Sequence, residues 1–512
     1  MIDMKTIRPL HVPATPLAGL IRGTAATGDL PPGATVNGVA LDSRAVTPGC
    51  LYVGLPGTHM HGARFASAAA SAGAVAVLTD AEGSALAADA GIPVLTSPHL
   101  RRDMALISRQ VFGAPGDRLE LFGVTGTNGK TTTVALLEAG LLALGRRAGT
   151  IGTVGFRLDG VPVPSGRGTV TTPDSPDLQA LLAVMEERGA QAVALEVSSH
   201  ALVLDRVAGL RFDVAAFLNL GHDHLDFHPD VEAYFEAKAS LFNPDMAERA
   251  VCWTDDARGA EIARRARQAG IPVWTVGTDA SCDFRLGGYA PVAPLGGLAL
   301  LEHAGATWQV RIALPGYHNM IDAAVALAML AVAGHPVDIA LESLATAQVP
   351  GRMQQVVLPG EAPCVIVDFA HTPQAVAATL RALRDSFDHV VTVIGCGGDR
   401  DAAKRPEMGR AAAESSQVVI ITDDNPRSED PGLIRRATIA GAEAAGGHVQ
   451  VEEVAGRRIA IERALGLAGR RSVVAILGKG HEQGQEVAGR ILPFDDAVEA
   501  RDAWARIGGA TT

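Results

Sequence analysis

The sequence predicts an α/β protein built from three domains. Its 512 residues exceed what one ordinary hydrophobic core accommodates, and a prior of about 150 residues per domain indicates three. Short apolar runs alternate with alanine-rich helical stretches, which is the pattern of parallel sheets covered by helices. Segments rich in proline and glycine interrupt this pattern near 114–116 and 349–351. The domains are therefore predicted at 1–116, 117–349 and 350–512.

Composition and charge narrow the kinds of partner that the chain can have. It is 47% hydrophobic and 20% charged, as soluble globular proteins are, and its net charge is −12. The acidic balance argues against nucleic acid as the main partner, and 4% aromatic residues leave few platforms for stacking single strands. The five cysteines are widely spaced with no CxxC pair, which favours a reducing compartment over a disulfide framework or a zinc ribbon.

Neither end nor interior of the sequence carries a membrane signal. The N-terminus lacks the apolar core of a signal peptide, and the longest apolar run, 323–334, is too short to span a bilayer. We therefore expect a cytoplasmic protein without a membrane span.

The first domain is expected to be a small α/β unit. Short strands are predicted at 51–53, 74–78 and 94–95, with alanine-rich helical stretches between them. The Ala-Pro-Gly of residues 114–116 ends the unit.

The second domain opens with LELFGVTGTNGKTTT at 119–133, an apolar strand that runs into a glycine-containing loop and then a helix. Gly126 and Gly129 allow a tight turn whose N–H groups face anionic oxygens, Lys130 supplies positive charge to the β/γ-phosphates, and the Thr131 hydroxyl suits Mg²⁺. The match to GxxxxGK[ST] is incomplete, because Val124 stands where the first glycine belongs. The strand before and the helix after nevertheless make this a P-loop-type domain that binds ATP. The predicted loop contacts are Gly126, Thr127, Asn128, Gly129, Lys130, Thr131 and Thr132.

Two further strands are predicted at 192–197 and 214–218, and polar residues follow each of them. Glu196 ends the first, where a carboxylate either ligates Mg²⁺ or is an ordinary satisfied strand-end group. The second runs into residues 219–228, which hold three histidines and two aspartates. Cysteine is absent there and the spacing fits no zinc pattern, so we expect one histidine, His224, to assist Mg²⁺.

The third domain is predicted to be a doubly wound, Rossmann-like sheet. Apolar strands at 364–368, 390–394, 418–422 and 473–477 are separated by helical spacers. Each strand ends in a polar cluster: DFAHTP, GCGGDRD, DDNPRSEDP and GKGHEQ, in that order. Ligands of such sheets bind beyond the carboxyl ends of the strands, so these four clusters predict one composite rim.

The motifs GTNGKTT, EVSSHAL, NLGHDHLDFH, GYHN, GRM, DFAHTP, GDRD, KRP and DNPR occur in this order over nearly the whole chain. Together they resemble the Mur ligases, and among these the branch of UDP-N-acetylmuramoyl-tripeptide synthetases. The resemblance implies an ATP-dependent acid–amino-acid ligase of peptidoglycan precursor synthesis, and so of cell-wall biogenesis, cell shape and division. It also implies an acyl-phosphate intermediate and a monomeric enzyme with the small-molecule substrates UDP-MurNAc-L-Ala-D-Glu and meso-diaminopimelate.

The resemblance also implies roles for individual residues. The first domain would hold the UDP end through Ser43 and Arg44. Glu196, His224 and Lys238 would serve the metal, Lys238 as a carbamate formed with CO₂, although a helical lysine taken alone is normally a surface residue. Because only a neutral amine captures CO₂, burial should lower the pKa of Lys238. The muramoyl-dipeptide would contact Thr171, Thr172, Ser199 and Arg206, and ATP would also contact Asn319, Arg352, Asp368 and His371.

The residues of the predicted rim suggest which amino acid is added. Diaminopimelate differs from lysine chiefly by a distal carboxylate, and Arg427 in DNPR offers a planar bidentate partner for that group. The alternative is that DDNPRSEDP is only a polar turn. The resemblance implies that lysine-adding relatives lack this arginine. The remaining contacts to the amino acid are expected from Arg400, Asp424, Asn425, Gly478 and Glu482.

At four positions the sequence departs from the pattern of the family. Asp322 stands where an asparagine is common, and an ionised carboxylate can only accept, so Asn319 is the better candidate for adenine. Ala403 replaces a glycine, Gly484 an aromatic residue, and Leu204 a glutamine. None of these touches the phosphate loop or the metal set.

Two other functions compete with this interpretation. A folylpolyglutamate synthase would share the ligase chemistry, but LDSR near the start and DNPR in the last domain speak against it. A nucleotide-controlled switch would need no third domain with a charged rim that fits an amino acid.

Overall fold

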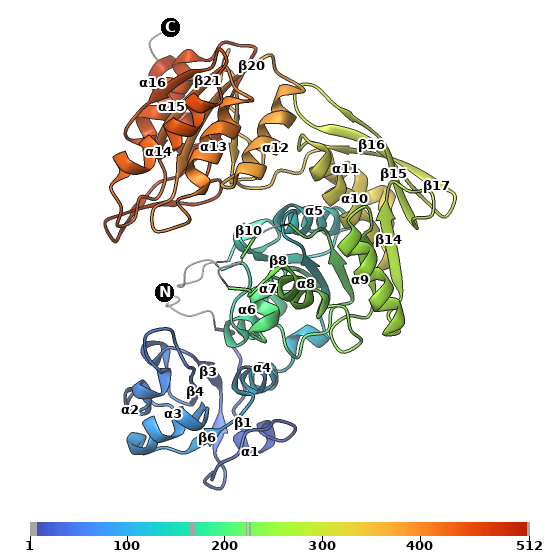
Figure 1. Cartoon of the computed structure of the whole chain (residues 1–512). Helices are drawn as coiled ribbons and strands as arrows, with labels where there is room; N and C mark the ends of the chain where they lie inside the picture. The colour runs from blue at the N-terminus through green and yellow to red at the C-terminus, as the bar shows by residue number, and fades with distance from the viewer. Residues whose placement is uncertain (1–7, 164–169, 222, 225–226, 509–512) are drawn as a thin grey trace. The chain divides into compact units, whose positions relative to one another are not determined.

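The computed structural model describes residues 8–163, 170–221, 223–224 and 227–508. These fold into two compact units, and the chain crosses between them more than once (Figure 1). The first unit comprises Met1–Leu286, Glu302–Ala306 and Ala324–Leu341, and the second comprises Gly287–Leu301, Thr307–Ala323 and Glu342–Thr512.

The N-terminal part of the first unit is a four-stranded parallel sheet; three of its strands are those that the sequence predicts, and β3 was not predicted. Its order is β3-β4-β5-β6, and the strands carry almost only buried side chains because helices cover them. The strands are β3 (Gly38–Ala40), β4 (Cys50–Gly54), β5 (Ala76–Thr79) and β6 (Val94–Thr96), and the helices are α2 (Ala66–Ser71), α3 (Ala81–Leu86) and α4 (Leu100–Val111). A two-stranded sheet, β1 (Thr15–Pro16) with β2 (Thr35–Val36), and α1 (Leu17–Leu20) precede them.

The rest of the first unit is built on a larger sheet, in which β7 (Glu120–Thr125) lies between β11 (Ala192–Glu196) and β12 (Val214–Phe217). All three strands run parallel, with Glu196 opposite Val124 and Phe217 opposite Thr125. The residues that follow these strands therefore meet at one sheet edge. The flanking strands are β10 (Val161–Pro162), β9 (Gly155–Leu158), β8 (Ala148–Gly152), β13 (Ala250–Trp253) and β14 (Val273–Gly277), and the helices are α5 (Lys130–Ala143), α6 (Ser175–Glu187), α7 (Ser199–Val203), α8 (Val231–Ala239) and α9 (Ala257–Gln268).

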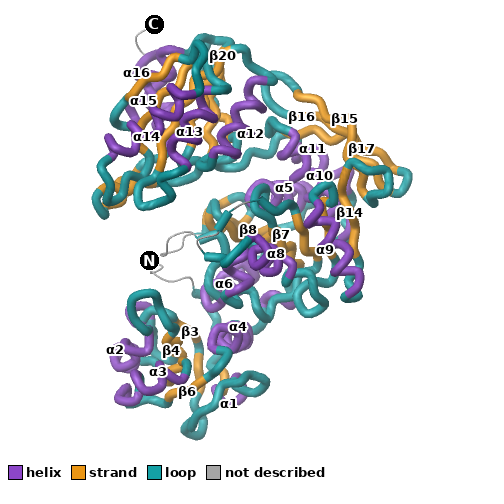
Figure 2. The backbone as a smooth tube through the Cα atoms, in the orientation of Figure 1, coloured by secondary structure: helices purple, strands orange, loops and turns teal. Residues whose placement is uncertain are grey.

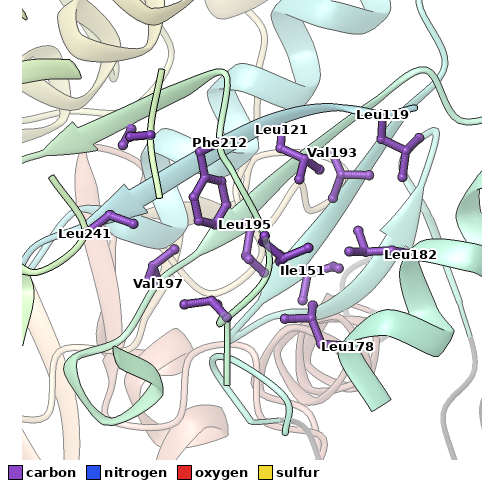
Figure 3. Packing of buried hydrophobic residues seen from close by; sticks show 14 of the residues in the cluster. Leu119, Leu121, Ile151, Leu178, Leu182, Val193, Leu195, Val197, Phe212 and Leu241 are labelled. Carbon is purple, nitrogen blue, oxygen red and sulfur yellow. The ribbon is translucent and has the colours of Figure 1, made fainter. Parts of the chain in front are cut away.

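The core of this sheet is packed by aliphatic side chains from neighbouring strands and from helix α6 (Figure 3). Leu121, Val193 and Leu195 are at most 2% exposed. The ring of Phe212 fills the space above Gly123, where an added Cβ would come within 2.8 Å of it. This packing fixes the strand that carries the phosphate loop.

The strands that follow β14 in the larger sheet, and the two helices after them, belong to segments that are split between the two units. They are β15 (Phe284–Pro291), β16 (Gly297–His303), β17 (Ala306–Ile312), α10 (Tyr317–Val332) and α11 (Val337–Leu344).

The second unit contains a six-stranded sheet with the order β18-β19-β23-β20-β21-β22. Its four central strands are the four that the sequence predicts, and they pair in parallel with one another. Helices pack beside these strands (Figure 2). The strands are β18 (Gln354–Gln355), β19 (Cys364–Asp368), β23 (Ser472–Leu477), β20 (His389–Cys396), β21 (Val418–Asp423) and β22 (Gln450–Glu453), and the helices are α12 (Pro373–Arg384), α13 (Lys404–Ala413), α14 (Pro431–Ala444), α15 (Arg457–Leu467) and α16 (Asp496–Gly508).

The sequence analysis did not predict a hairpin that follows β23. It consists of β24 (Gly484–Val487) and β25 (Arg490–Pro493), which pair antiparallel. The hairpin matters for the site because Arg427 bridges to Val487 on it.

Two expectations drawn from composition can be compared with the structure. All five cysteines are free thiols. Among the described residues, no helix has the length and apolar character needed to cross a membrane.

Candidate active site

The phosphate loop follows β7 and is held in shape by Asn219, which follows the neighbouring strand β12. The Asn219 carbonyl accepts from Thr127 N at 3.0 Å, and its side chain exchanges two hydrogen bonds with the backbone of Asn128, at 3.0 and 3.2 Å. Gly129 has φ +89°, a left-handed conformation that a side chain would strain, and α5 begins directly after it. The loop is thus fixed at the N-terminus of a helix, where backbone N–H groups favour anions.

Lys130 lies over the loop that it follows. Its ammonium donates to the carbonyls of Gly126 at 2.8 Å and Thr127 at 2.9 Å. Thr131 and Thr132, in the first turn of α5, are 7% and 4% exposed. The structure thus brings the Lys130 ammonium and the predicted loop residues together at the N-terminus of α5.

Lys238 in α8 is buried, although a helical lysine is usually solvated. It is 1% exposed, its Nζ donates to the Gly126 carbonyl at 2.8 Å, and it lies 4.5 Å from the centre of the Tyr234 ring. Burial above all, and then the charge of Lys130, lower the pKa of Lys238 well below its ordinary value, against an opposing effect of Asp223. The expectation that burial lowers the pKa of this lysine is confirmed.

Glu196 ends β11 beside the loop, and its carboxylate is held by one residue. It is 1% exposed and accepts from Thr153 N at 2.8 Å and from the Thr153 hydroxyl at 3.0 Å. Gly152 leaves the room that this carboxylate occupies, since an added Cβ would lie 2.2 Å from Oε1. Both interpretations of Glu196 therefore remain open: the group is internally bonded, and it still has acceptor capacity for a cation.

The four residues predicted to contact the muramoyl-dipeptide lie next to Glu196. Thr171 Oγ1 is 3.1 Å from Thr153 Oγ1, and the Thr172 hydroxyl donates to the Glu196 carbonyl at 2.7 Å. Arg206 donates to the Thr172 carbonyl at 2.9 Å and pairs with Asp174 at 3.0 Å, while Ser199 Oγ is 2.9 Å from His228 Nε2. The structure thus brings these residues together with Glu196 at one sheet edge.

His224 adopts a left-handed backbone conformation, with φ +54°, and its side chain is 43% exposed. Its ring lies 4.8 Å from that of His200 and its Nε2 lies 3.5 Å from Asp223. Positions 222, 225 and 226 of the same segment lie outside the described residues. Among the residues that are described, no group of three or more histidine, cysteine or acidic side chains is arranged to hold a metal.

Ser43 and Arg44 lie in a short 3₁₀ turn after β3, which Asp42 caps by accepting from Arg44 N at 2.9 Å. The Arg44 guanidinium donates to the Asp42 carboxylate at 2.7 Å while the side chain stays 89% exposed. It is therefore available to an anionic ligand.

In the second unit, the residues predicted to contact ATP gather around the end of β19. Arg352 lies 4.7 Å from the Phe369 ring, and His371 Nδ1 is 2.8 Å from the Phe369 carbonyl. Asp368 accepts from Met353 N at 2.7 Å and Ala370 N at 2.9 Å, so its carboxylate also fixes the strand end.

Asn319 and Asp322 lie in the first turns of α10 and are 3% and 4% exposed. The Asn319 amide donates to Pro315 O at 2.7 Å.

The predicted amino-acid rim is assembled at the ends of β21 and β23. Arg427 has φ +53°; its Nε donates to Glu486 at 3.1 Å and its Nη1 to Gly398 O at 2.7 Å. Asp424 is 7% exposed, and burial raises its pKa against the lowering effects of Arg457 and Lys479. These residues are thus held by internal hydrogen bonds and partly buried.

Three further rim residues lie close to these. The Asn425 amide donates to Glu482 at 2.8 Å. Gly478, with φ +112°, has no room for a side chain, because an added Cβ would lie 2.6 Å from the Asp424 carboxylate. Arg400, after β20, is exposed.

Sequence reasoning missed two features of this rim. Lys479 is fully buried and contacts Asn425 and Glu482; the available signal was a lysine directly after an apolar strand and three residues before a glutamate. The hairpin β24–β25 was missed as well, although Gln485 donates to the Asp424 carbonyl at 2.6 Å. Its strands are too short and too polar to be predicted from pattern.

Three departures from the family pattern are accommodated locally. Ala403 N donates to Asp401 at 2.9 Å immediately before α13. Gly484 packs against the hairpin partner strand, where a Cβ would meet Ile491 at 2.7 Å. Leu204 ends α7 and is half-buried.

Comparisons with known proteins agree with this geometry. Sequence models of three Mur ligase domains match: the Mur ligase family catalytic domain at 35–109, the middle domain at 124–330, and the glutamate ligase domain at 351–480. Together they cover well over half of the chain.

Full-length relatives and solved structures give the same result. The chain is 43% identical to the UDP-N-acetylmuramoyl-L-alanyl-D-glutamate–2,6-diaminopimelate ligase of Streptomyces avermitilis over 97% of both chains. It is 42% identical to the enzyme of the same name from Corynebacterium glutamicum over 91% of both. A solved structure of a ligase with this name has a TM-score of 0.66 at 32% identity, covering 92% of this chain and 95% of that one. The chain therefore belongs to the Mur ligase family.

Proposed function

We propose that this chain is an ATP-dependent ligase that joins meso-diaminopimelate to the γ-carboxylate of UDP-MurNAc-L-Ala-D-Glu in peptidoglycan precursor synthesis. The choice of amino acid rests on Arg427, whose guanidinium can pair with the distal carboxylate of diaminopimelate. This residue has a left-handed backbone conformation and follows the buried Asp424 by three positions. The relatives that are 42–43% identical carry the name of this activity over nearly their full length.

The phosphate loop supports the first half of the reaction. A carboxylate is a poor electrophile, so the γ-carboxylate attacks the γ-phosphorus of ATP and ADP leaves, which gives an acyl phosphate. Charge spreads over the equatorial oxygens of the transferring group, and Lys130 and the amides at the start of α5 would stabilise it. Thr171, Thr172, Ser199 and Arg206 would orient the dipeptide beside the loop.

The residues of the first unit fit a Mg²⁺ that belongs to the nucleotide. The Glu196 carboxylate, the Thr131 hydroxyl and His224 are oxygen and nitrogen donors, and Mg²⁺ needs few protein ligands when phosphates supply the others. Bound there, Mg²⁺ would supply positive charge to the phosphate oxygens.

Lys238 is proposed to react with CO₂ and become a carbamate that serves the same metal region. Its amine is buried beside another cation, which favours the neutral form that attacks CO₂; a C–N bond forms and one proton is released. The test is ¹³C NMR of the protein in ¹³C-bicarbonate, where a carbamate resonance present in the wild type and absent in Lys238→Met is expected. Identical spectra would exclude the carbamate.

The rim of the second unit supports the second half of the reaction, in which the amino acid is added. The amine of the amino acid attacks the acyl phosphate, loses a proton, and phosphate leaves from a tetrahedral intermediate. Arg427 would pair with the distal carboxylate of diaminopimelate, with Arg400, Asp424, Asn425, Gly478 and Glu482 as the further contacts.

The experiment that tests the proposal measures ATP-dependent phosphate release with UDP-MurNAc-L-Ala-D-Glu and either meso-diaminopimelate, L-lysine or no amino acid. Release with diaminopimelate alone is expected. Release with lysine would keep the ligase and overturn the role of Arg427. No release with either would overturn both the ligase and its substrates.

Several further predictions accompany this proposal. ATP is expected to contact Asn319, Arg352, Asp368 and His371, and the UDP group to contact Ser43 and Arg44. The domain boundaries at 116 and 349 also remain predictions. A monomeric protein in the cytoplasm is proposed with them, and light scattering of the purified protein checks the monomer.

A further inference from the structure

Lys479 is a fully buried lysine that the reaction described above does not use. It follows β23, and its side chain is 0% exposed. Its ammonium donates to Asn425 Oδ1 at 3.0 Å and to Glu482 Oε2 at 2.9 Å, and it lies 3.8 Å from Asp424 Oδ1. One cation therefore contacts three of the residues predicted to bind the amino acid.

These contacts fix which way the Asn425 amide points. Its Oδ1 accepts from Lys479 Nζ and also from Glu486 N at 2.9 Å, while its Nδ2 donates to Glu482. Both lone pairs of the oxygen and one N–H of the amide are therefore used within the protein. What Asn425 still offers is one N–H donor, which suits a carboxylate and not an ammonium.

Of the two carboxylates beside Lys479, Glu482 is the one that suits a substrate ammonium. Its Oε2 lies 2.9 Å from Lys479 Nζ, whereas Asp424 Oδ1 lies 3.8 Å away. Burial raises the pKa of Asp424, while against the opposing effect of its burial, Lys479 and the hydrogen bond from Asn425 lower the pKa of Glu482.

The Glu482 carboxylate is the exposed end of this arrangement. Its side chain is 34% exposed, whereas those of Lys479 and Asp424 are 0% and 10% exposed. A ligand therefore reaches Glu482 while the lysine behind it stays shielded from water.

We propose that Lys479 is a positioning residue of the amino-acid site, whose buried ammonium orients the Asn425 amide and the Glu482 carboxylate toward one carboxylate and one ammonium of the incoming amino acid. This inference rests on the proposed function, because it assumes that the rim binds an amino acid. Lys479 itself stays behind these groups and does not touch the ligand.

The test compares Lys479→Met, which keeps the volume of the side chain and removes its charge, with the wild type. Phosphate release is measured while meso-diaminopimelate, ATP and UDP-MurNAc-L-Ala-D-Glu are varied in turn. The KM for diaminopimelate is expected to rise at least about tenfold, with the other two KM values within about twofold. A role confined to folding would change the active fraction and leave all three KM values alone.

A matched control removes a cation from an ion pair elsewhere in the same unit, between helix α15 and strand β22. Arg463→Met breaks the pair with Glu452 on β22, where the arginine side chain is 49% exposed, and unchanged KM values are expected. If Lys479→Met does not purify as folded protein, Lys479→Gln replaces it, because the amide is neutral, smaller and still able to donate. The same rise in KM is expected.

The proposal is overturned if the KM for the amino acid stays within about twofold of the wild type, or if all three KM values rise together. Failure of the proposed function would be detected separately, as the absence of phosphate release from the wild-type protein. If the wild type uses an amino acid other than diaminopimelate, the KM for that amino acid is the one to compare, and it still tests Lys479.

Discussion

Two buried lysines, one in each compact unit, are placed in opposite surroundings. Lys238 is 1% exposed and has a backbone carbonyl, an aromatic ring and a neighbouring cation around it. Lys479 is 0% exposed and has two carboxylates and an amide oxygen around it. Burial alone therefore does not decide what a lysine does: its neighbours favour a neutral, reactive amine at Lys238, whereas at Lys479 they accept hydrogen bonds from the side chain and fix its position.

The largest expected effect concerns the cation that sits beside Lys238. Lys130→Ala removes the ammonium that would stabilise the transferring phosphoryl group, so phosphate release is expected to fall about 1000-fold. Steady-state phosphate release checks this, with the thermal midpoint as control for folding. Turnover within a few-fold of the wild type would show that this loop does not hold the reacting phosphates.

The contrast between the two lysines predicts stability changes of opposite sign. Lys479→Met leaves the buried Asp424 and the partly exposed Glu482 without their cation and is expected to lower the free energy of unfolding by about 3 kcal/mol. Lys238→Met, in buffer free of CO₂ and Mg²⁺, removes an amine that burial disfavours and is expected to raise it by on the order of 1 kcal/mol. Thermal unfolding of the wild type and of both variants measures these changes. Midpoints that shift in the same direction for both variants would contradict the prediction.

The gain from Lys238→Met is expected to depend on pH. The pKa of Lys238 is lowered in the folded state from an ordinary value of 10.5, so the unfolded chain binds more protons between these two values. Wild-type stability therefore rises with pH across that window, and the advantage of the methionine variant shrinks toward pH 10.5. A gain that grows with pH would contradict the lowered pKa.

The smaller of the two expected losses of activity concerns the partly buried Arg427 of the amino-acid rim. Arg427→Ala removes one charged partner of the distal carboxylate, and the KM for diaminopimelate is expected to rise roughly 10- to 100-fold, with the KM for ATP unchanged. Glu486→Gln serves as a control that keeps the arginine and removes its internal partner. An equal rise for all substrates would mean that Arg427 holds the fold rather than the amino acid.

The two regions also differ in how well the sequence predicted them. The phosphate loop is contiguous, and its glycines, lysine and flanking strand and helix all lie within 119–133, so local pattern suffices. Glu196 was predicted beside it because parallel strands end at a shared edge, and the burial of Lys238 was predicted only through the chemistry of CO₂ capture.

The rim was predicted in part, because its residues come from separate strand ends. The order of β19, β23, β20 and β21 brings the polar clusters together, as expected. The carboxylates around Lys479 come partly from the end of another strand, 55 residues earlier in the chain at Asp424. The local signal, a lysine three residues before a glutamate, therefore does not by itself show that Lys479 is buried. The side chains of the hairpin β24–β25 are half-buried or exposed, so the sequence shows no alternation of hydrophobic and polar residues that would predict it.

The most direct measurement is a competition in which the purified protein receives ATP, UDP-MurNAc-L-Ala-D-Glu and equal amounts of meso-diaminopimelate and L-lysine. Mass spectrometry then distinguishes the two possible products, because the diaminopimelate product is heavier by one CO₂. The diaminopimelate product is expected in large excess from the wild type and in a much smaller excess from Arg427→Ala. A lysine product from the wild type would contradict the account.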